Sequence, residues 1–174
     1  MGRIRTRGRY LLTAGLFFLM VSPLRAQENT TLKRHAIYFE TFGQGGLYSL
    51  NYDYRIKPTL SVRVGFTTWG FSFLGNGFTF TGFPVMLNYL SGKKSSHFEA
   101  GLGCMPATVN YHSDGYNPFF VMEGQGTTTR VIGTATIGYR LQPPKGGFIL
   151  RAGLTPFFTN QVKLYAGVSV GVGF

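Results

Sequence analysis

The chain has 174 residues, of which 17 are Lys or Arg, 6 are Asp or Glu and only one is Cys. This length allows one domain, and a charged fraction of 13% beside a hydrophobic fraction of 44% excludes a disordered, solvated polymer. The single Cys excludes an internal disulfide framework and a Cys-based zinc site. The abundance of Gly (25 residues), Phe (17) and Tyr (10) favours an all-β fold over helices.

Residues 1–26 have the pattern of a secretory signal peptide. Four Arg residues at positions 3–9 precede the apolar run 10–21, and Ala26 offers a small residue at a cleavage position before Gln27. Only 15 residues separate Arg9 from Arg25, fewer than the roughly 20 that a membrane-spanning helix needs. We therefore expect 1–26 to be removed and 27–174 to form the folded domain.

Removal of this segment lowers the net charge from +11 to +6, because five Arg residues leave with it and 12 basic against 6 acidic residues remain. The remaining Lys and Arg residues are scattered, apart from Lys33 with Arg34 and Lys93 with Lys94. Nucleic-acid binding needs a concentrated basic face. The sequence therefore argues against a nucleic-acid partner.

Two-residue alternation of apolar and polar side chains recurs along the mature chain and predicts strands. In 47–56, for example, Tyr48, Leu50 and Tyr52 alternate with Ser49 and Asn51. Each segment has about the 9–11 residues that a tilted membrane-spanning strand requires. The eight predicted strands are 34–42, 47–56, 59–69, 80–90, 97–105, 127–140, 148–155 and 163–174.

One face of every predicted strand is apolar, whereas the opposite face carries small and charged residues. Arg and Glu facing the core of a soluble sandwich cost free energy unless they are paired. A membrane barrel instead turns its apolar face toward lipid and its polar face into a narrow lumen, where many Gly residues fit. We therefore predict an all-β fold, an eight-stranded antiparallel transmembrane β-barrel. The residues expected to line its lumen are Glu40, Asp53, Arg55, Arg63, Glu99, Arg130, Arg140 and Arg151, with His97 near one end.

These lumen charges are interpreted as a structural network, because a barrel of eight strands is just wide enough to be filled by its own side chains. A selectivity lining or a proton path is the alternative.

The predicted connections are short at 57–58, 91–96 and 141–146 and mostly longer at 43–46, 70–79, 106–126 and 156–162, with 43–46 as the exception. Short periplasmic turns and longer outer loops would place both termini in the periplasm. The aromatic residues expected to include the interfacial girdle are Tyr48, Tyr52, Trp69, Tyr89, Tyr139 and Tyr165.

A secretory signal, eight amphipathic strands and a final strand ending in Phe174 together resemble the small outer-membrane β-barrel proteins of Gram-negative bacteria. The resemblance implies export through the secretory pathway, contact with outer-membrane lipid, and recognition of Phe174 by the barrel-assembly machinery. The final strand lacks the family's usual second aromatic residue on the face of Val168, Val170 and Val172. The resemblance does not specify an activity, and nothing in the sequence predicts a cofactor or a metal site.

The longest predicted loop, 106–126, is where we expect a specific function. Rigid barrels carry recognition on loops, because their strands are committed to lipid on one side and to packing on the other. Aromatic residues on an otherwise polar loop are typical anchors for a partner. We therefore predict a structural or surface-interaction role through the outer loops. The expected anchors are Tyr111, Tyr116, Phe119 and Phe120.

Two other functions remain open. His112, Ser113 and Asp114 in the same loop are residue types that could make the base, nucleophile and orienting acid of an outer-membrane lipid-modifying enzyme. Lipid A deacylases are eight-stranded barrels with a His and a Ser two positions apart, whereas His112 and Ser113 are adjacent, a spacing that disfavours catalysis. A secreted lipocalin-like barrel would bind a ligand in an apolar interior.

Overall fold

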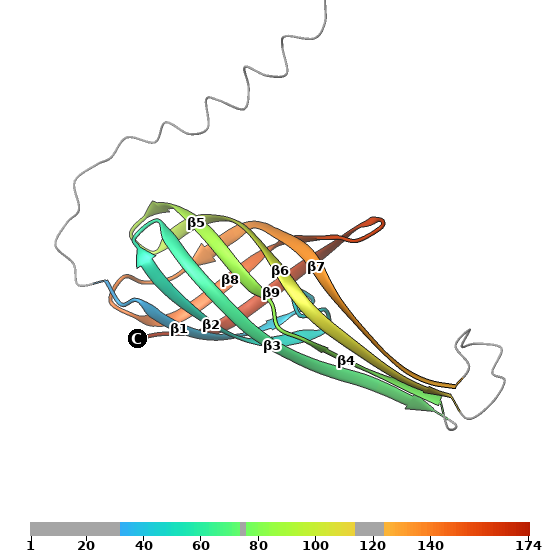
Figure 1. The fold of residues 1–174 in the computed structure, drawn as a ribbon. Helices are drawn as coiled ribbons and strands as arrows, with labels where there is room; N and C mark the ends of the chain where they lie inside the picture. The colour runs from blue at the N-terminus through green and yellow to red at the C-terminus, as the bar shows by residue number, and fades with distance from the viewer. Residues whose placement is uncertain (1–31, 74–75, 114–123) are drawn as a thin grey trace, which may run out of the picture. The chain divides into compact units, whose positions relative to one another are not determined.

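A computed structural model of the protein describes residues 32–73, 76–113 and 124–174, and this part of the chain consists of β-strands joined by turns (Figure 1). The described residues contain no helix long and apolar enough to cross a membrane. The predicted signal segment 1–26 lies outside them. The strands are β1 (His35–Thr41), β2 (Tyr48–Lys57), β3 (Leu60–Phe73), β4 (Asn76–Gly82), β5 (Val85–Lys93), β6 (Ser96–Ser113), β7 (Gly124–Leu141), β8 (Gly147–Phe158) and β9 (Val162–Gly173).

The strands close into a ring. Every pairing is antiparallel, and β9 pairs back with β1 to complete the circle. β4 and β5 share one position in this ring, because each of them pairs with β3 on one side and with β6 on the other. The result is an eight-stranded antiparallel barrel, which confirms the predicted fold class.

The ninth strand comes from an interruption near Pro84, inside the predicted strand 80–90. The register against β3 is the same on both sides of the break, with Thr67 opposite Gly82 and Val64 opposite Val85. Pro84 has no N–H to donate to the ladder, so the regular hydrogen bonding is broken there. One predicted segment therefore becomes two strands without a change of register or of side-chain direction.

The two faces of the barrel wall have opposite polarity. On β2 and β3, Asp53 and Arg63 point inward and are fully buried, whereas the adjacent Tyr52 and Val64 point outward and are 38% and 46% exposed. A soluble barrel would bury its apolar residues and expose its charges. Exposed apolar side chains continue around the outside of the ring, among them Phe39, Leu50, Phe66, Leu87, Leu102, Ile137, Leu154 and Val170.

The two ends of the barrel differ. At one end, where β1 starts and β9 ends, turns of two to five residues join β2 to β3, β5 to β6 and β7 to β8. We call this the turn end. At the opposite end β3, β4, β6 and β7 continue past the other strands as one four-stranded sheet (Figure 1). This projecting sheet comprises 67–73, 76–82, 107–113 and 124–131, beyond the last pairing of β3 with β2 and of β7 with β8.

The projecting sheet corrects two predicted loops. The segment 70–79 is mostly strand, because β3 runs to Phe73 and β4 begins at Asn76. Within 106–126, β6 extends to Ser113 and β7 begins at Gly124, which leaves only 114–123 outside the described residues. The outward residues of these segments are polar, so the apolar outward face that marks the other strands is missing here. Their inward residues still alternate with them, as a strand requires.

Candidate functional site

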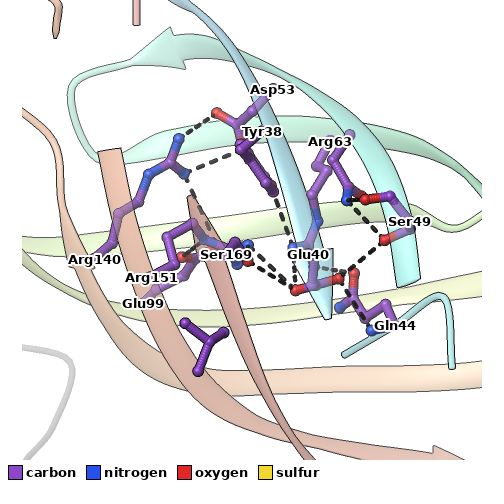
Figure 2. Close-up of polar contacts among 12 residues, drawn as sticks. Tyr38, Glu40, Gln44, Ser49, Asp53, Arg63, Glu99, Arg140, Arg151 and Ser169 are labelled. Carbon is purple, nitrogen blue, oxygen red and sulfur yellow. Dashed lines mark hydrogen bonds and ion pairs between the residues drawn. The ribbon is translucent and has the colours of Figure 1, made fainter. Parts of the chain in front are cut away.

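Candidate functional side chains gather in two places, the lumen and the projecting sheet. In the lumen, Arg140 donates two hydrogen bonds to Asp53, from Nη1 to Oδ2 at 3.1 Å and from Nη2 to Oδ1 at 3.0 Å (Figure 2). The hydroxyl of Ser61 donates a further bond to Asp53 at 3.1 Å. All three side chains are fully buried. Because β2 and β7 stand four positions apart in a ring of eight, this ion pair spans the barrel.

A second bidentate pair joins Arg151 of β8 to Glu99 of β6, with both N···O distances at 2.8 Å. The remaining amino group of Arg151 lies 3.5 Å from Glu40 of β1 and donates to the hydroxyl of Ser169 of β9 at 3.2 Å. Its guanidinium carbon is 4.8 Å from the ring centroid of Tyr38, a cation–π distance. Arg151 thus holds three other strands together through one side chain (Figure 2).

Arg63 and Arg55 complete the group that we call the lumen network: Glu40, Asp53, Arg55, Arg63, Glu99, Arg140 and Arg151. Arg63 lies 3.6 Å from Glu40 and also donates to the side-chain oxygen of Gln44. Arg55 differs, because its partner among the described residues is the neutral Gln142, at 3.1 Å. The network therefore contains four guanidinium groups and three carboxylates, all of them buried.

Seven of the eight residues predicted to line the lumen lie there, and Arg130 does not. Arg130 is exposed, opposite Ala107, on the projecting part of β7. Its side chain has the parity of the lumen, but β8 stops pairing with β7 at Gly133, so the barrel is already open at its level. The prediction that Arg130 lines the lumen is therefore wrong, because this residue lies beyond the closed part of the barrel on β7.

Three residues that contact the lumen network, Tyr38, Gln44 and Gln142, were not predicted from the sequence. Tyr38 is fully buried and lies two positions before Glu40, so strand alternation places both on one face and could have identified it. Gln44 and Gln142 lie in turns, where no alternation points to them. His97 is buried near the turn end, as expected.

The lumen is filled by side chains along its length. A cavity with room for about one water molecule remains beside Arg151. Apolar side chains close the lumen where the projecting sheet begins. This cluster consists of Met105, Ala107 and Phe157, with Phe80 and Ile132 packed against it.

A row of four threonines crosses the sheet where it leaves the barrel. The registers place Thr68, Thr81, Thr108 and Thr129 opposite one another on β3, β4, β6 and β7. The hydroxyls pair at 3.1 Å between the first two and at 3.0 Å between the last two. Outward residues change character at this row. The neighbouring row on the barrel side is Phe66, Phe83, Pro106 and Val131, and the row beyond the threonines is Gly70, Thr79, Asn110 and Thr127.

The inward face of the projecting sheet is mainly aromatic on β3, β4 and β6. The ring of Trp69 lies 5.2 Å from that of Phe80 and 5.5 Å from that of Phe78, between centroids. The indole N–H also donates to the carbonyl of Gly45 at 3.3 Å. The polarity of the wall is thus reversed on β3, β4 and β6: apolar outside and polar inside within the barrel, polar outside and apolar inside beyond it. On β7 the inward positions Thr128 and Arg130 are polar. We call Trp69, Phe71, Phe78, Phe80, Val109 and Tyr111 the aromatic face.

The other predicted sites lie on or near this sheet. Trp69 faces inward and is therefore not part of an outward interfacial girdle, which corrects that expectation. Tyr111 belongs to the aromatic face, whereas His112 is exposed on the opposite, polar face. The side chain of Ser113 and the residues Asp114, Tyr116, Phe119 and Phe120 lie outside the described part of the chain. Among the described residues, no three His, Cys, Asp or Glu side chains are grouped as metal ligands.

A scan against protein-family models and a search of curated proteins give no match. Among solved structures, the N-terminal β-barrel domain of Pseudomonas aeruginosa OprF is similar with a TM-score of 0.55 at 16% identity, over 81% of this chain and 98% of that one. The fold is that of a small outer-membrane β-barrel. Ail of Yersinia pestis (TM-score 0.49, 15% identity, 80% and 92% covered) and the Neisserial surface protein NspA (0.47, 13%, 80% and 90%) are also similar.

Proposed function

We propose that residues 27–174 sit in the outer membrane, after a signal at 1–26 has directed export and been removed. The outward apolar rows support this location. On β6 they run from Phe98 to Pro106, eight residue steps or about 26 Å along the strand. At a tilt of about 40° this corresponds to about 20 Å across the membrane, comparable with the apolar band of about 25 Å on such barrels. Short turns at the turn end favour a periplasmic position for it, with the projecting sheet outside the cell.

The same proposal assigns Phe174 to recognition by the barrel-assembly machinery. Phe174 follows β9 and is exposed, with its ring stacked on that of His35 at 5.7 Å. Its backbone N–H and C=O pair with those of His35, at 2.9 and 3.2 Å, in the folded barrel. A chain that had not yet closed would leave this strand edge free for a partner.

We further propose a surface-interaction role, carried by the projecting sheet and not by the lumen. The observation that supports it is the reversal of polarity at the threonine row. Apolar rings inside a sheet that no longer surrounds a closed lumen are partly exposed, Phe71 by 54%. Clustered aromatic side chains next to polar rows are typical of recognition surfaces.

The two alternatives have less support. A lipocalin-like barrel needs an apolar interior, whereas this lumen contains a network of buried charges. A lipid-modifying enzyme needs a base and a nucleophile within hydrogen-bonding reach of each other. His112 is exposed on the polar face of β6 and directly adjacent to Ser113 in the sequence, a spacing that disfavours this geometry. A general diffusion pore is also disfavoured, because the lumen network and the apolar cluster fill the interior.

Trp69 provides a test of the location, because it is the one Trp of the chain. In vesicles, lipids brominated in their acyl chains should quench its fluorescence weakly, whereas aqueous acrylamide should reach it. The outward apolar side chains of the barrel wall, which we call the apolar belt, include Leu102, which is 69% exposed. The control is therefore a Trp69→Phe, Leu102→Trp variant, whose Trp should be quenched strongly by the lipid. Equal quenching of both variants by brominated lipid would place the projecting sheet inside the bilayer and refute the proposal.

The interaction role is tested with an array of purified extracellular proteins and polysaccharides, probed with the full chain in lipid nanodiscs. Binding should be lost in a Phe71→Ser, Phe78→Ser variant and retained in a Thr79→Ala, Thr127→Ala variant, which changes only the polar face. If no array component binds, or if both variants lose binding equally, the aromatic face is not a recognition surface.

A further inference from the structure

Charge is divided unevenly between the parts of this barrel. The acidic side chains of the described residues are Glu40, Asp53 and Glu99, and all three are buried in the lumen. Among the described residues, the turn end has none. It carries instead six exposed cations, which we call the basic rim: Lys33, Arg34, Lys57, Lys93, Lys94 and Lys145. The projecting end carries only Arg130 and Lys163 among the described charged residues.

Backbone hydrogen bonds show that the basic rim is continuous around the turn end. The segment before β1 joins β2 through the bond from the N–H of Arg55 to the carbonyl of Arg34, at 2.8 Å. The same segment joins the β7–β8 turn through the bond from Lys33 to Pro144, also 2.8 Å. Two more bonds link the remaining turns to their neighbours, Leu90 to Thr59 at 2.8 Å and Gln142 to Ser95 at 2.7 Å.

The rim borders the apolar belt of the barrel. Lys57 directly follows Ile56, which is exposed on the outside of β2. Lys93 and Lys94 precede Phe98, and Lys145 precedes Phe148, both of which are more than half exposed. If the belt lies in the hydrocarbon, the cations reach the level of the lipid headgroups, where long Lys and Arg side chains extend to the interface.

We propose that the basic rim binds the headgroups of anionic phospholipids in the membrane leaflet at the turn end. Six like charges with no acidic side chain among the described residues around them repel one another, and an anionic headgroup relieves this repulsion. Clustered Lys and Arg residues beside a membrane-spanning segment attract anionic lipid in this way. The inference rests on the proposed membrane location, and it names the lipid class that one end of the barrel prefers.

The test uses the full chain refolded in phosphatidylcholine vesicles, with spin-labelled phosphatidylglycerol or spin-labelled phosphatidylcholine as the probe. At low salt, phosphatidylglycerol should associate about fivefold more strongly. Changing the four lysines in or next to the turns (Lys57→Gln, Lys93→Gln, Lys94→Gln, Lys145→Gln) should reduce the preference to below about twofold. The matched control, Arg130→Gln with Lys163→Gln at the other end, should keep it. In the unaltered chain, about 1 M salt should abolish the preference for phosphatidylglycerol. This measurement tests the proposal even if the fourfold variant does not fold.

Three results would overturn this inference. The first is equal association of both lipids with the unaltered chain, and the second is loss of preference in the control variant to the same degree. The third is binding of soluble inorganic polyphosphate without a preference for phosphatidylglycerol, which would assign the basic rim to a soluble polyanion. Failure of the chain to insert into vesicles at all would count against the membrane location instead, so the two proposals can be distinguished.

Discussion

Replacing Asp53 with Asn removes one charge from the lumen network without changing the size of the side chain. Arg140 then keeps its buried position but loses both charge-assisted hydrogen bonds, at 3.0 and 3.1 Å. Removing one partner of a buried ion pair costs about 3–5 kcal/mol, because the other charge stays buried without compensation. The excess of guanidinium groups over carboxylates in the network also rises from one to two. We expect the free energy of unfolding to fall by about 3–5 kcal/mol.

Two further variants separate the ion pair from its surroundings. Ser61→Ala removes a neutral donor to Asp53 at 3.1 Å and should cost about 0.5–1.5 kcal/mol. The double variant Asp53→Asn, Arg140→Gln removes both charges, so it should be more stable than the sum of the two single losses predicts, by more than about 1 kcal/mol. Arg140 also lies 4.0 Å from Glu99. The double variant loses this second ion pair too, so it should remain less stable than the unaltered chain.

The assay is urea unfolding of the refolded barrel in lipid vesicles, followed by Trp69 fluorescence and by the heat-modifiable mobility of the folded barrel on gels. A loss below about 1 kcal/mol for Asp53→Asn would refute the reasoning, because it would mean that water already solvates this pair and that the lumen is not sealed. Strict additivity of the two single variants would refute it as well, since it would show that the two side chains do not interact.

Three other predictions follow from the barrel wall. Val64→Arg should destabilise the barrel by about 2–4 kcal/mol, because it places a charge in lipid. Ser72→Arg lies on the same strand and face but beyond the threonine row, so it should change the free energy of unfolding by less than about 0.5 kcal/mol. Similar costs for both variants would contradict the reversal of polarity. Gly171→Ala should cost about 1–3 kcal/mol, because its new Cβ would overlap the carbonyl oxygen of Ile37 and the Cα and Cβ of Tyr38. Gly133→Ala should be tolerated, because its Cβ would meet only Phe158, at 3.5 Å. The same unfolding midpoint for both variants would show that the barrel can rearrange around Gly171. Purified protein in planar bilayers should give no stable, long-lived conductance steps, and large ones would show that the lumen is open.

The sequence alone determined the class of fold and the direction of most side chains. A strand has a period of two, so the alternation in 47–56 and 163–174 is a local property that fixes which residues share a face. The combination of charges on one face with apolar residues on the other then indicated a barrel with a polar interior. Of the eight residues predicted to line the lumen, seven lie there. The same reasoning could have added Tyr38, which shares its face with Glu40.

Only the tertiary structure decided how far each strand extends and which charges meet. Whether a position such as Arg130 lies in the lumen depends on where β8 stops pairing with β7, and that height is set by the register between distant strands. The cross-barrel pairs, Arg140 with Asp53 and Arg151 with Glu99, arise when the ring closes and brings opposite strands together. The aromatic face was hidden for a related reason. Beyond the threonine row the alternation continues but its polarity is reversed. A prediction that requires outward residues to be apolar therefore assigns loops where the chain forms strands.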